Sequence, residues 1–227
     1  LPIAILAQII IGSSAVFDKL LLKKRAIEPW AYTFWFGILG LFAIVLLPFG
    51  YQPTAFPVIF LALLGGAFFI ASAFLYFRTL EEIEASEALP LLGTLSPIAT
   101  LILSALWLGT PLGVLDFIGF GFLIASGFSL FLTERKEIGA RHLFAIAFAG
   151  VLLAASHVLS KTVFNETSFI TGFFWVKLGG AFAVLLPLAW SKFRRAILVS
   201  EHASTRNKIW YFANRGYAAV GSLLVSF

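Results

Sequence analysis

The stretch that decides the fold is FITGFFWVKLGGAFAVLLPLAW, which runs from Phe169 to Trp190. A helix needs about 20 mostly apolar residues to cross the hydrocarbon core of a bilayer, and this run is long enough to do so. Lys177 interrupts the run far from either end. A Lys or Arg at the centre of a spanning helix costs about 2.5 to 3.5 kcal/mol on insertion scales, so its presence there indicates a functional site. We therefore predict a membrane-spanning helix with a buried cation.

The composition of the whole chain agrees with a membrane protein. Hydrophobic residues make up 60% and charged residues 12% of the 227 residues, far from the mixture typical of soluble domains. The net charge of +5 lies mostly in the connectors between apolar runs, which indicates positive-inside topology rather than nucleic-acid binding. The sequence has no Cys and its three His have no metal-ligand spacing, so we predict no metal site and no cofactor. It also lacks a phosphate-binding loop and a nucleophile elbow, so we predict that it is not an enzyme.

Runs of the same kind recur along the chain. We predict seven complete spans, at about 1–22, 30–49, 56–77, 87–108, 112–132, 143–164 and 169–190, and an eighth that begins near Ile209 and is cut off by the last residue. The odd-numbered connectors carry nearly all the Lys and Arg residues outside the spans, which predicts that these connectors face the cytoplasm and that Leu1 lies outside. The long basic connector at 191–208 is either a helix lying along the headgroups or a flexible loop.

An internal repeat divides the chain into two parts. Phe34-Trp35 recurs as Phe174-Trp175, Leu46-Leu47-Pro48 as Leu185-Leu186-Pro187, Ser14 and Lys19 as Ser156 and Lys161, and Gly66, Ser72 and Phe77 as Gly216, Ser222 and Phe227. We predict a first five-helix repeat at 1–133, a connector at 134–142 and a second repeat at 143–227 that stops in its third helix, so that two further helices follow in the complete protein. Because each repeat has an odd number of helices, the two are inverted in the membrane. The register places Arg215 opposite Gly65, near the middle of a span.

The segment from Gly65 to Phe131 carries a set of short motifs. They are Tyr76-Phe77-Arg78, Ala85-Ser86, Leu95-Ser96-Pro97, Leu108-Gly109, Gly119 and Gly127. In these motifs, and in Gly12-Ser13-Ser14 followed by Lys19, the chain resembles the EamA-type repeat of the drug/metabolite transporter superfamily. The resemblance implies two inverted repeats of five helices each, a central cavity and alternating-access transport of small metabolites.

The candidate substrate-binding residues are Lys177, Arg215, Asn214, His157, Trp175, Trp35, Tyr76 and Gln8. If Lys177 and Arg215 both face the cavity, they are two uncompensated cations, and a carboxylate or phosphate group is their natural partner. Arg215 could instead snorkel to the headgroups from the start of its helix. Lys177 could pair with an acid in the helices that we expect to follow.

Each of the other candidates has a structural alternative. His157 is either a packing residue or part of a proton relay. Trp35 and Trp175 either anchor their helices at the membrane interface or contact the substrate. Tyr76 and Gln8 either line the cavity or make hydrogen bonds between helices.

The acidic residues of this sequence lie near predicted helix ends or in connectors. Asp18, Glu87 and Asp116 are near helix ends, where a carboxylate costs little, so we expect no carboxylate deep in the membrane within residues 1–227, and an acidic proton carrier is either absent or in the helices that we expect to follow. The cluster Glu81, Glu82, Glu84 and Glu87 is predicted to be a solvated loop, with gating pairs to the basic connectors as the alternative.

We predict a secondary transporter, an exporter or exchanger, of small organic anions in the cytoplasmic (plasma) membrane. Its partners would be a small-molecule substrate and the lipid bilayer, with no nucleic acid. The alternative within the superfamily is a transporter of phosphorylated sugars or nucleotide sugars, which also need basic cavities. An alternative of another class is an integral-membrane scaffold or subunit that transports nothing.

Overall fold

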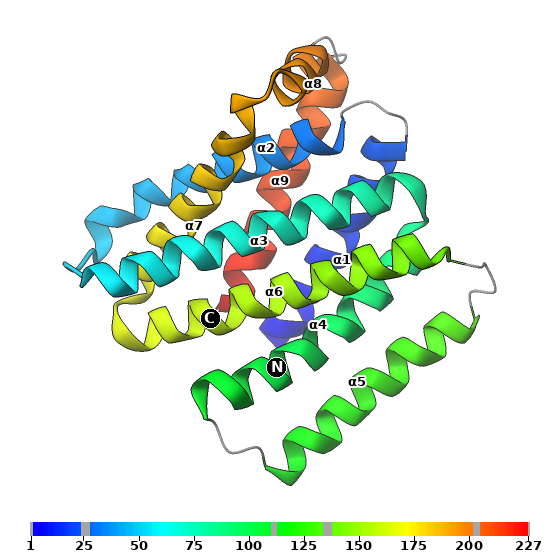
Figure 1. The fold of residues 1–227 in the computed structure, drawn as a ribbon, viewed down its shortest axis with the longest axis vertical. Coiled ribbons are helices and arrows are strands. Elements are labelled where there is room, and N and C mark those ends of the chain that lie inside the picture. The colour runs from blue at the N-terminus through cyan, green and yellow to red at the C-terminus, as the bar shows by residue number, and fades with distance from the viewer. Residues whose placement is uncertain (1, 24–27, 110–112, 134–137, 202–204, 227) are drawn as a thin grey trace.

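The chain is folded almost entirely into helices (Figure 1). The computed structural model describes residues 2–23, 28–109, 113–133, 138–201 and 205–226. Its elements are α1 (Pro2–Lys23), α2 (Pro29–Leu39), η1 (Gly40–Phe49), α3 (Phe56–Glu82), α4 (Ala85–Leu108), α5 (Val114–Thr133), α6 (Ala140–Glu166), α7 (Phe169–Leu185), η2 (Leu186–Ala189), α8 (Ser191–Glu201) and α9 (Thr205–Ser226). No strand occurs in the described ranges, which confirms the predicted all-α fold.

Five of the described helices are long and apolar enough to cross a membrane. They are Pro29–Phe49, Phe56–Glu82, Ala85–Leu108, Ala140–Glu166 and Phe169–Ala189. Each coincides with one of the predicted spans, so the prediction of a polytopic membrane protein is confirmed. The described apolar part of α5, Val114–Gly127, is shorter. The predicted eighth span corresponds to α9, which begins at Thr205.

The second predicted span changes helix type at its middle, and the seventh changes near its end. The α-helix of the second ends at Leu39 and continues as the 3-10 helix η1, which contains Pro48. The seventh changes at Leu186 into η2, which contains Pro187. A proline has no N–H to donate to the preceding turn, and the tighter 3-10 turn is one way in which a helix accommodates it. Each remains one span, Pro29–Phe49 and Phe169–Ala189, and the change of helix type was not predicted, because hydrophobicity does not reveal it.

The acidic connector between α3 and α4 is much shorter than predicted. Helix α3 continues to Glu82, and only Ile83 and Glu84 precede α4. The side chains of Glu84 and Glu87 each accept a hydrogen bond from the other's backbone N–H, which forms a capping box at the start of α4. Glu87 is also buried. The prediction of a solvated loop was therefore wrong for these two residues, which stabilise a helix terminus.

Helix α3 crosses the middle of the bundle, with α6 running antiparallel to it and α7 packed on its other side (Figure 1). Helix α6 also packs on α4, and α5 lies at the edge against α4. Helix α1 packs along α9 behind α3. Lys19 fixes α1 at the end of α3, because its ammonium donates hydrogen bonds to the Leu80 and Ile83 carbonyls at 2.7 and 2.5 Å.

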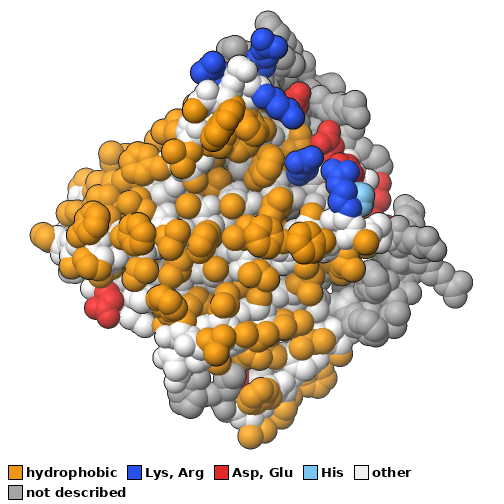
Figure 2. All heavy atoms as spheres, in the orientation of Figure 1, with side chains coloured by type: hydrophobic (Ala, Val, Ile, Leu, Met, Phe, Trp, Pro, Cys, Tyr) orange, Lys and Arg blue, Asp and Glu red, His pale blue; other side chains and the backbone are white. Residues whose placement is uncertain are grey.

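Charged side chains gather at one end of the bundle (Figure 2). On the face shown, Lys, Arg, Asp and Glu side chains cluster where α3 ends and α6 begins, while hydrophobic side chains cover most of the rest. Helix α8 lies at the same end and exposes Lys192, Arg194 and Arg195. Phe193 of α8 packs edge-on against Trp30 of α2, with ring centroids 4.7 Å apart. The segment that begins the 191–208 connector is thus a helix, one of the two predicted alternatives.

Candidate functional site

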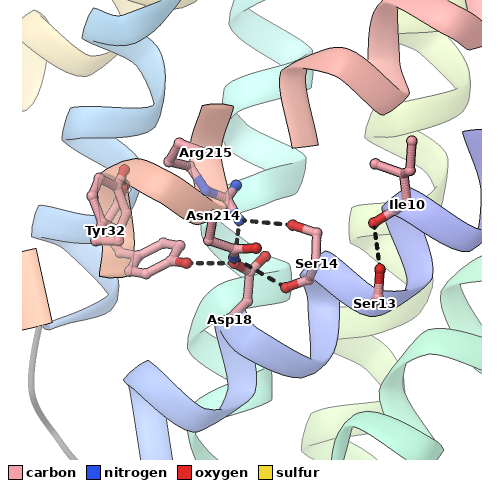
Figure 3. Close-up of polar contacts among 8 residues, drawn as sticks. Ile10, Ser13, Ser14, Asp18, Tyr32, Asn214 and Arg215 are labelled. Atoms are coloured by element: carbon pink, nitrogen blue, oxygen red, sulfur yellow. Dashed lines mark hydrogen bonds and ion pairs between the residues drawn. The ribbon is translucent and has the colours of Figure 1, made fainter. Parts of the chain in front are cut away.

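A buried ion pair joins α1 to α9 (Figure 3). Arg215 Nη2 contacts Asp18 Oδ1, and the two side chains are only 6% and 7% exposed. Charges at such positions are retained when they are paired and hydrogen-bonded, because an isolated one would have to give up its hydration without compensation. The pair therefore marks the point where α1 and α9 must meet in register.

Two further donors reach the same carboxylate oxygen. Asn214 Nδ2 donates to Asp18 Oδ1 at 2.5 Å, and the Tyr32 hydroxyl of α2 donates to it as well. Asn214 Nδ2 also donates to the Ser14 carbonyl at 3.1 Å, and Tyr211 donates to the Tyr32 carbonyl at 2.9 Å. Side chains from two helices, α2 and α9, thus surround one carboxylate oxygen of α1.

The local sequence explains why these side chains share a face. Ser14 and Asp18 are four residues apart on α1, so they lie one above the other on the helix surface. Tyr211 and Arg215 have the same spacing on α9. The guanidinium of Arg215 also contacts Ser14 Oγ at 3.5 Å. The polar face of α1 formed by Ser14 and Asp18 therefore meets the face of α9 formed by Tyr211 and Arg215.

Aromatic rings enclose the arginine. The guanidinium carbon of Arg215 lies 5.2 Å from the ring centroids of Tyr32 and Phe36, 5.8 Å from that of Phe77 and 5.9 Å from that of Tyr211. Such cation–π contacts stabilise a protein more when water is excluded, because the attraction between the cation and the ring is then less screened. Arg215 is thus held by one carboxylate and four rings.

Several buried polar atoms beside the ion pair have no hydrogen-bond partner among the described residues. They are Arg215 Nε, Asn214 Oδ1 and the Tyr76 hydroxyl. Tyr76 is near the pair, since its ring lies 5.6 Å from the Phe77 ring that faces Arg215. The cluster therefore has donors and acceptors beyond those that Asp18 engages.

Lys177 lies in a different setting on α7. Its ammonium is 5.0 Å from the ring centroid of Phe173 and 5.3 Å from that of Phe69. Its aliphatic stem runs beside Gly40, where a Cβ would lie 3.5 Å from Lys177 Cδ. No hydrogen bond or ion pair joins its side chain to any other described residue. Within the described ranges, this ammonium therefore faces aromatic rings and no acidic side chain.

The two cations share one group of aromatic rings. The Phe69 ring that Lys177 faces is 5.7 Å from the ring of Phe36, and Phe36 in turn faces Arg215. Phe36 comes from α2 and Phe69 from α3. The structure therefore connects the settings of Lys177 and Arg215 through two phenylalanines.

The remaining candidates are placed as follows. Trp35 packs its ring against Phe212 of α9 at 6.0 Å. Trp175 packs against Phe174 at 5.3 Å, and its buried Nε1 has no partner among the described residues. The side chain of His157 is exposed on α6. The side chain of Gln8 lies outside the described residues.

Two expectations about the charges were wrong. Arg215 is not an uncompensated cation, because Asp18 pairs with it. Asp18 is itself a buried carboxylate. Its place near the end of a predicted span had led us to expect contact with water, where a carboxylate costs little free energy. The predicted depth of Arg215 could have indicated a carboxylate partner, because a charge inside a helical bundle is usually paired. Asp18 was a candidate for this partner, since it lies one helical turn after Ser14, a residue of the repeat pattern.

A polytopic helical bundle with a buried ion pair, and with a further cation that has no ion-pair partner among the described residues, has the features of a membrane transporter. Residues 1–132 match the model of the EamA-like transporter family. Because this match covers more than half of the chain, the protein belongs to the EamA-like transporter family. The comparisons found no match among curated proteins or solved structures.

Membership gives the function at a coarse level. The protein is a multi-pass membrane transporter of the drug/metabolite transporter superfamily, with a small-molecule substrate and a lipid environment. The family consists of transporters and not enzymes, in agreement with the prediction.

Proposed function

We propose that the protein is a secondary transporter, an exporter or exchanger, of small organic anions in the cytoplasmic membrane. The observation that carries this proposal is Lys177, a cation inside the bundle with no acidic partner among the described residues. This ammonium contacts the rings of Phe69 and Phe173 and has three donors to offer, which a negative group on a substrate would satisfy.

The surroundings of Lys177 favour an organic rather than an inorganic anion. Phe69 and Phe173 flank the ammonium, and Phe36 lies next to Phe69. Small-molecule sites combine such apolar walls with a few polar groups that fix orientation. We therefore assign the charged group of the substrate to Lys177 and its apolar body to these rings. Trp35, Trp175 and Tyr76 are proposed as further contacts.

The mechanism that we propose is alternating access between two inverted repeats, at 1–133 and 143–227, joined by 134–142. In this register α6 is equivalent to α1, and α9 to α3. The packing supports it, because α3 packs on α6 and α9 packs on α1, so the third helix of each repeat crosses the first helix of the other. Rocking of one repeat against the other would change both crossings together.

Transport by purified protein in proteoliposomes tests the proposal. Labelled benzoate, succinate and glucose 6-phosphate would be offered to the wild-type protein, to Lys177→Ala and to a matched control, Lys161→Ala, whose lysine is exposed on α6. We expect uptake or exchange of a carboxylate by the wild type and the control. We expect at least about a tenfold loss in Lys177→Ala, because the anion loses its charged partner.

The other outcomes have definite meanings. Equal flux in the wild type and Lys177→Ala would remove Lys177 from the site. Flux of glucose 6-phosphate alone would favour the sugar-phosphate alternative. No flux of any of these anions by folded protein would favour the non-transporting scaffold.

A further inference from the structure

The cluster around Asp18 has the form of a carboxylate-binding site that a residue of the chain itself occupies. Arg215 Nη2, Asn214 Nδ2 and the Tyr32 hydroxyl all donate to one oxygen of Asp18. Charge-assisted hydrogen bonds of this kind are the stronger ones in proteins, and arginine suits planar carboxylates. We name this set of donors, Arg215, Asn214 and Tyr32, the carboxylate receptor.

The equivalent crossing in the proposed repeats has no ion pair at the matching positions. In the proposed repeat register, Gly65 of α3 and Ser160 of α6 are the equivalents of Arg215 and Asp18. They face one another at the α3/α6 crossing, where a Cβ on Gly65 would lie 3.6 Å from Ser160 Oγ. Of these two equivalent crossings, α3/α6 therefore has no charged residue at the positions that Arg215 and Asp18 occupy in α1/α9. A buried ion pair is weak grounds for stability, because desolvation offsets its attraction.

Asp18 also leaves part of the receptor unused. Nε and Nη2 of an arginine lie on the same edge of the guanidinium and together form a fork that can hold both oxygens of a carboxylate. In Arg215, Nη2 contacts Asp18, whereas Nε has no partner among the described residues. Arg215 is 7% exposed and Asn214, with its unpartnered Oδ1, is 5% exposed. A ligand free to orient could engage the whole fork.

The receptor adjoins the proposed substrate site. Phe36 faces Arg215, its ring is next to that of Phe69, and Phe69 faces Lys177. Movement of a carboxylate from the lysine to the arginine would follow one continuous group of rings.

We infer that Asp18 is an internal carboxylate that occupies the receptor, and that the carboxylate of a substrate takes its place there during transport. This inference rests on the proposed function and narrows the substrate class to organic acids with a carboxylate group. When the substrate engages Nε and Nη2, Asp18 leaves Arg215, and the polar link between α1 and α9 is released. Asp18 then determines affinity as a competitor of the substrate.

The first test compares benzoate binding to the purified protein and to Asp18→Asn, measured by calorimetry. The asparagine keeps the shape of the side chain and removes its charge, so the internal competitor is weakened. We expect Asp18→Asn to bind benzoate about tenfold more tightly than the wild type, and Asp18→Asn/Arg215→Gln to lose this gain. A folded Asp18→Asn with unchanged or weaker binding would overturn the inference.

The second test also suits a folded variant of reduced stability, because its readout is a change in melting temperature. Asp18→Gly removes the internal carboxylate and leaves room for a free one. We expect sodium acetate to raise its melting temperature saturably, above the effect of sodium chloride at the same ionic strength, and to have a much smaller effect on the wild type and on Asp18→Gly/Arg215→Gln. Equal effects of acetate and chloride on Asp18→Gly would show that the receptor accepts no free carboxylate.

The outcomes of these tests distinguish a failure of the inference about Asp18 from a failure of the proposed transport function. If Lys177→Ala abolishes flux while Asp18→Asn binds benzoate like the wild type, Asp18 is a structural counterion in an anion transporter. If the wild type moves no anion but acetate stabilises Asp18→Gly, the receptor exists and the assignment of transport is wrong.

Discussion

Two helix crossings with the same place in the proposed repeats are built in opposite ways. At α3/α6, Gly65 lies against α6, where its Cβ would meet Leu159 at 3.4 Å, and Ser72 donates to the Ala149 carbonyl at 2.7 Å. At α1/α9, Arg215 and Asn214 bind Asp18. The first crossing is held by close approach of the helices and the second by exchangeable polar contacts.

The difference indicates how the two crossings divide the work of a transporter. Close packing of small residues is lost whenever the helices separate, because dispersion contacts fall off steeply with distance. Arg215 can exchange one carboxylate for another of the same chemistry, so that its own charge stays paired while Asp18 is released. We therefore expect α3/α6 to act as a fixed contact and α1/α9 as the contact that changes with the substrate.

The largest expected effect on stability comes from removing the cation of the ion pair at α1/α9. Arg215→Gln leaves Asp18 buried without its cation, and removing one partner of a buried pair costs about 3 to 5 kcal/mol. Unfolding in detergent, followed by circular dichroism, measures this loss of stability. Asp18→Asn/Arg215→Gln is the matched control, and we expect it to regain most of the stability because no charge is left unpaired. An equally unstable double variant would mean that Arg215 acts through its ring contacts rather than through Asp18.

A smaller effect is expected from overpacking the apolar crossing. Gly65→Leu places a side chain where Leu159 already lies, and overpacking typically costs about 1 to 3 kcal/mol. The same unfolding measurement applies, with Gly93→Leu as the control because no atom lies within 4 Å of a Cβ there. If Gly65→Leu also leaves anion flux unchanged, α3/α6 does not have the fixed role that we assign to it.

The sequence predicts one of the two cations well and the other poorly, for a physical reason. Lys177 stands out because its neighbours along the chain are apolar, which is a local property. The partnership of Arg215 with Asp18 spans a separation of 197 residues, and it arises only when α9 crosses α1. Counting residues places Asp18 near a helix end, and the count does not reveal that α2 and α9 cover that end.

The same contrast holds for the fold. The predicted spans at 56–77 and 143–164 match α3 and α6 because a run of apolar residues fixes a spanning helix by its length alone. The 3-10 segment Gly40–Phe49 was not predicted, since its residues are as apolar as the helix before it. The capping box of Glu84 and Glu87 depends on where the backbone turns, which their charges alone do not indicate.

The smallest expected effect is at the charged end of the α3/α6 crossing, where exposed ions join the two helices. Glu82 Oε2 lies 2.6 Å from His142 Nε2, and Glu82 Oε1 lies 3.7 Å from Arg141 Nη2. The Glu82 side chain is 40% exposed, so water screens both contacts, and exposed pairs contribute less than about 1 kcal/mol. We expect Glu82→Gln to unfold within this margin of the wild type, with the difference vanishing in high salt, and Glu81→Gln to serve as its control. A loss as large as that of Arg215→Gln would show that α3/α6 is also held by its charges, and the contrast between the two crossings would disappear.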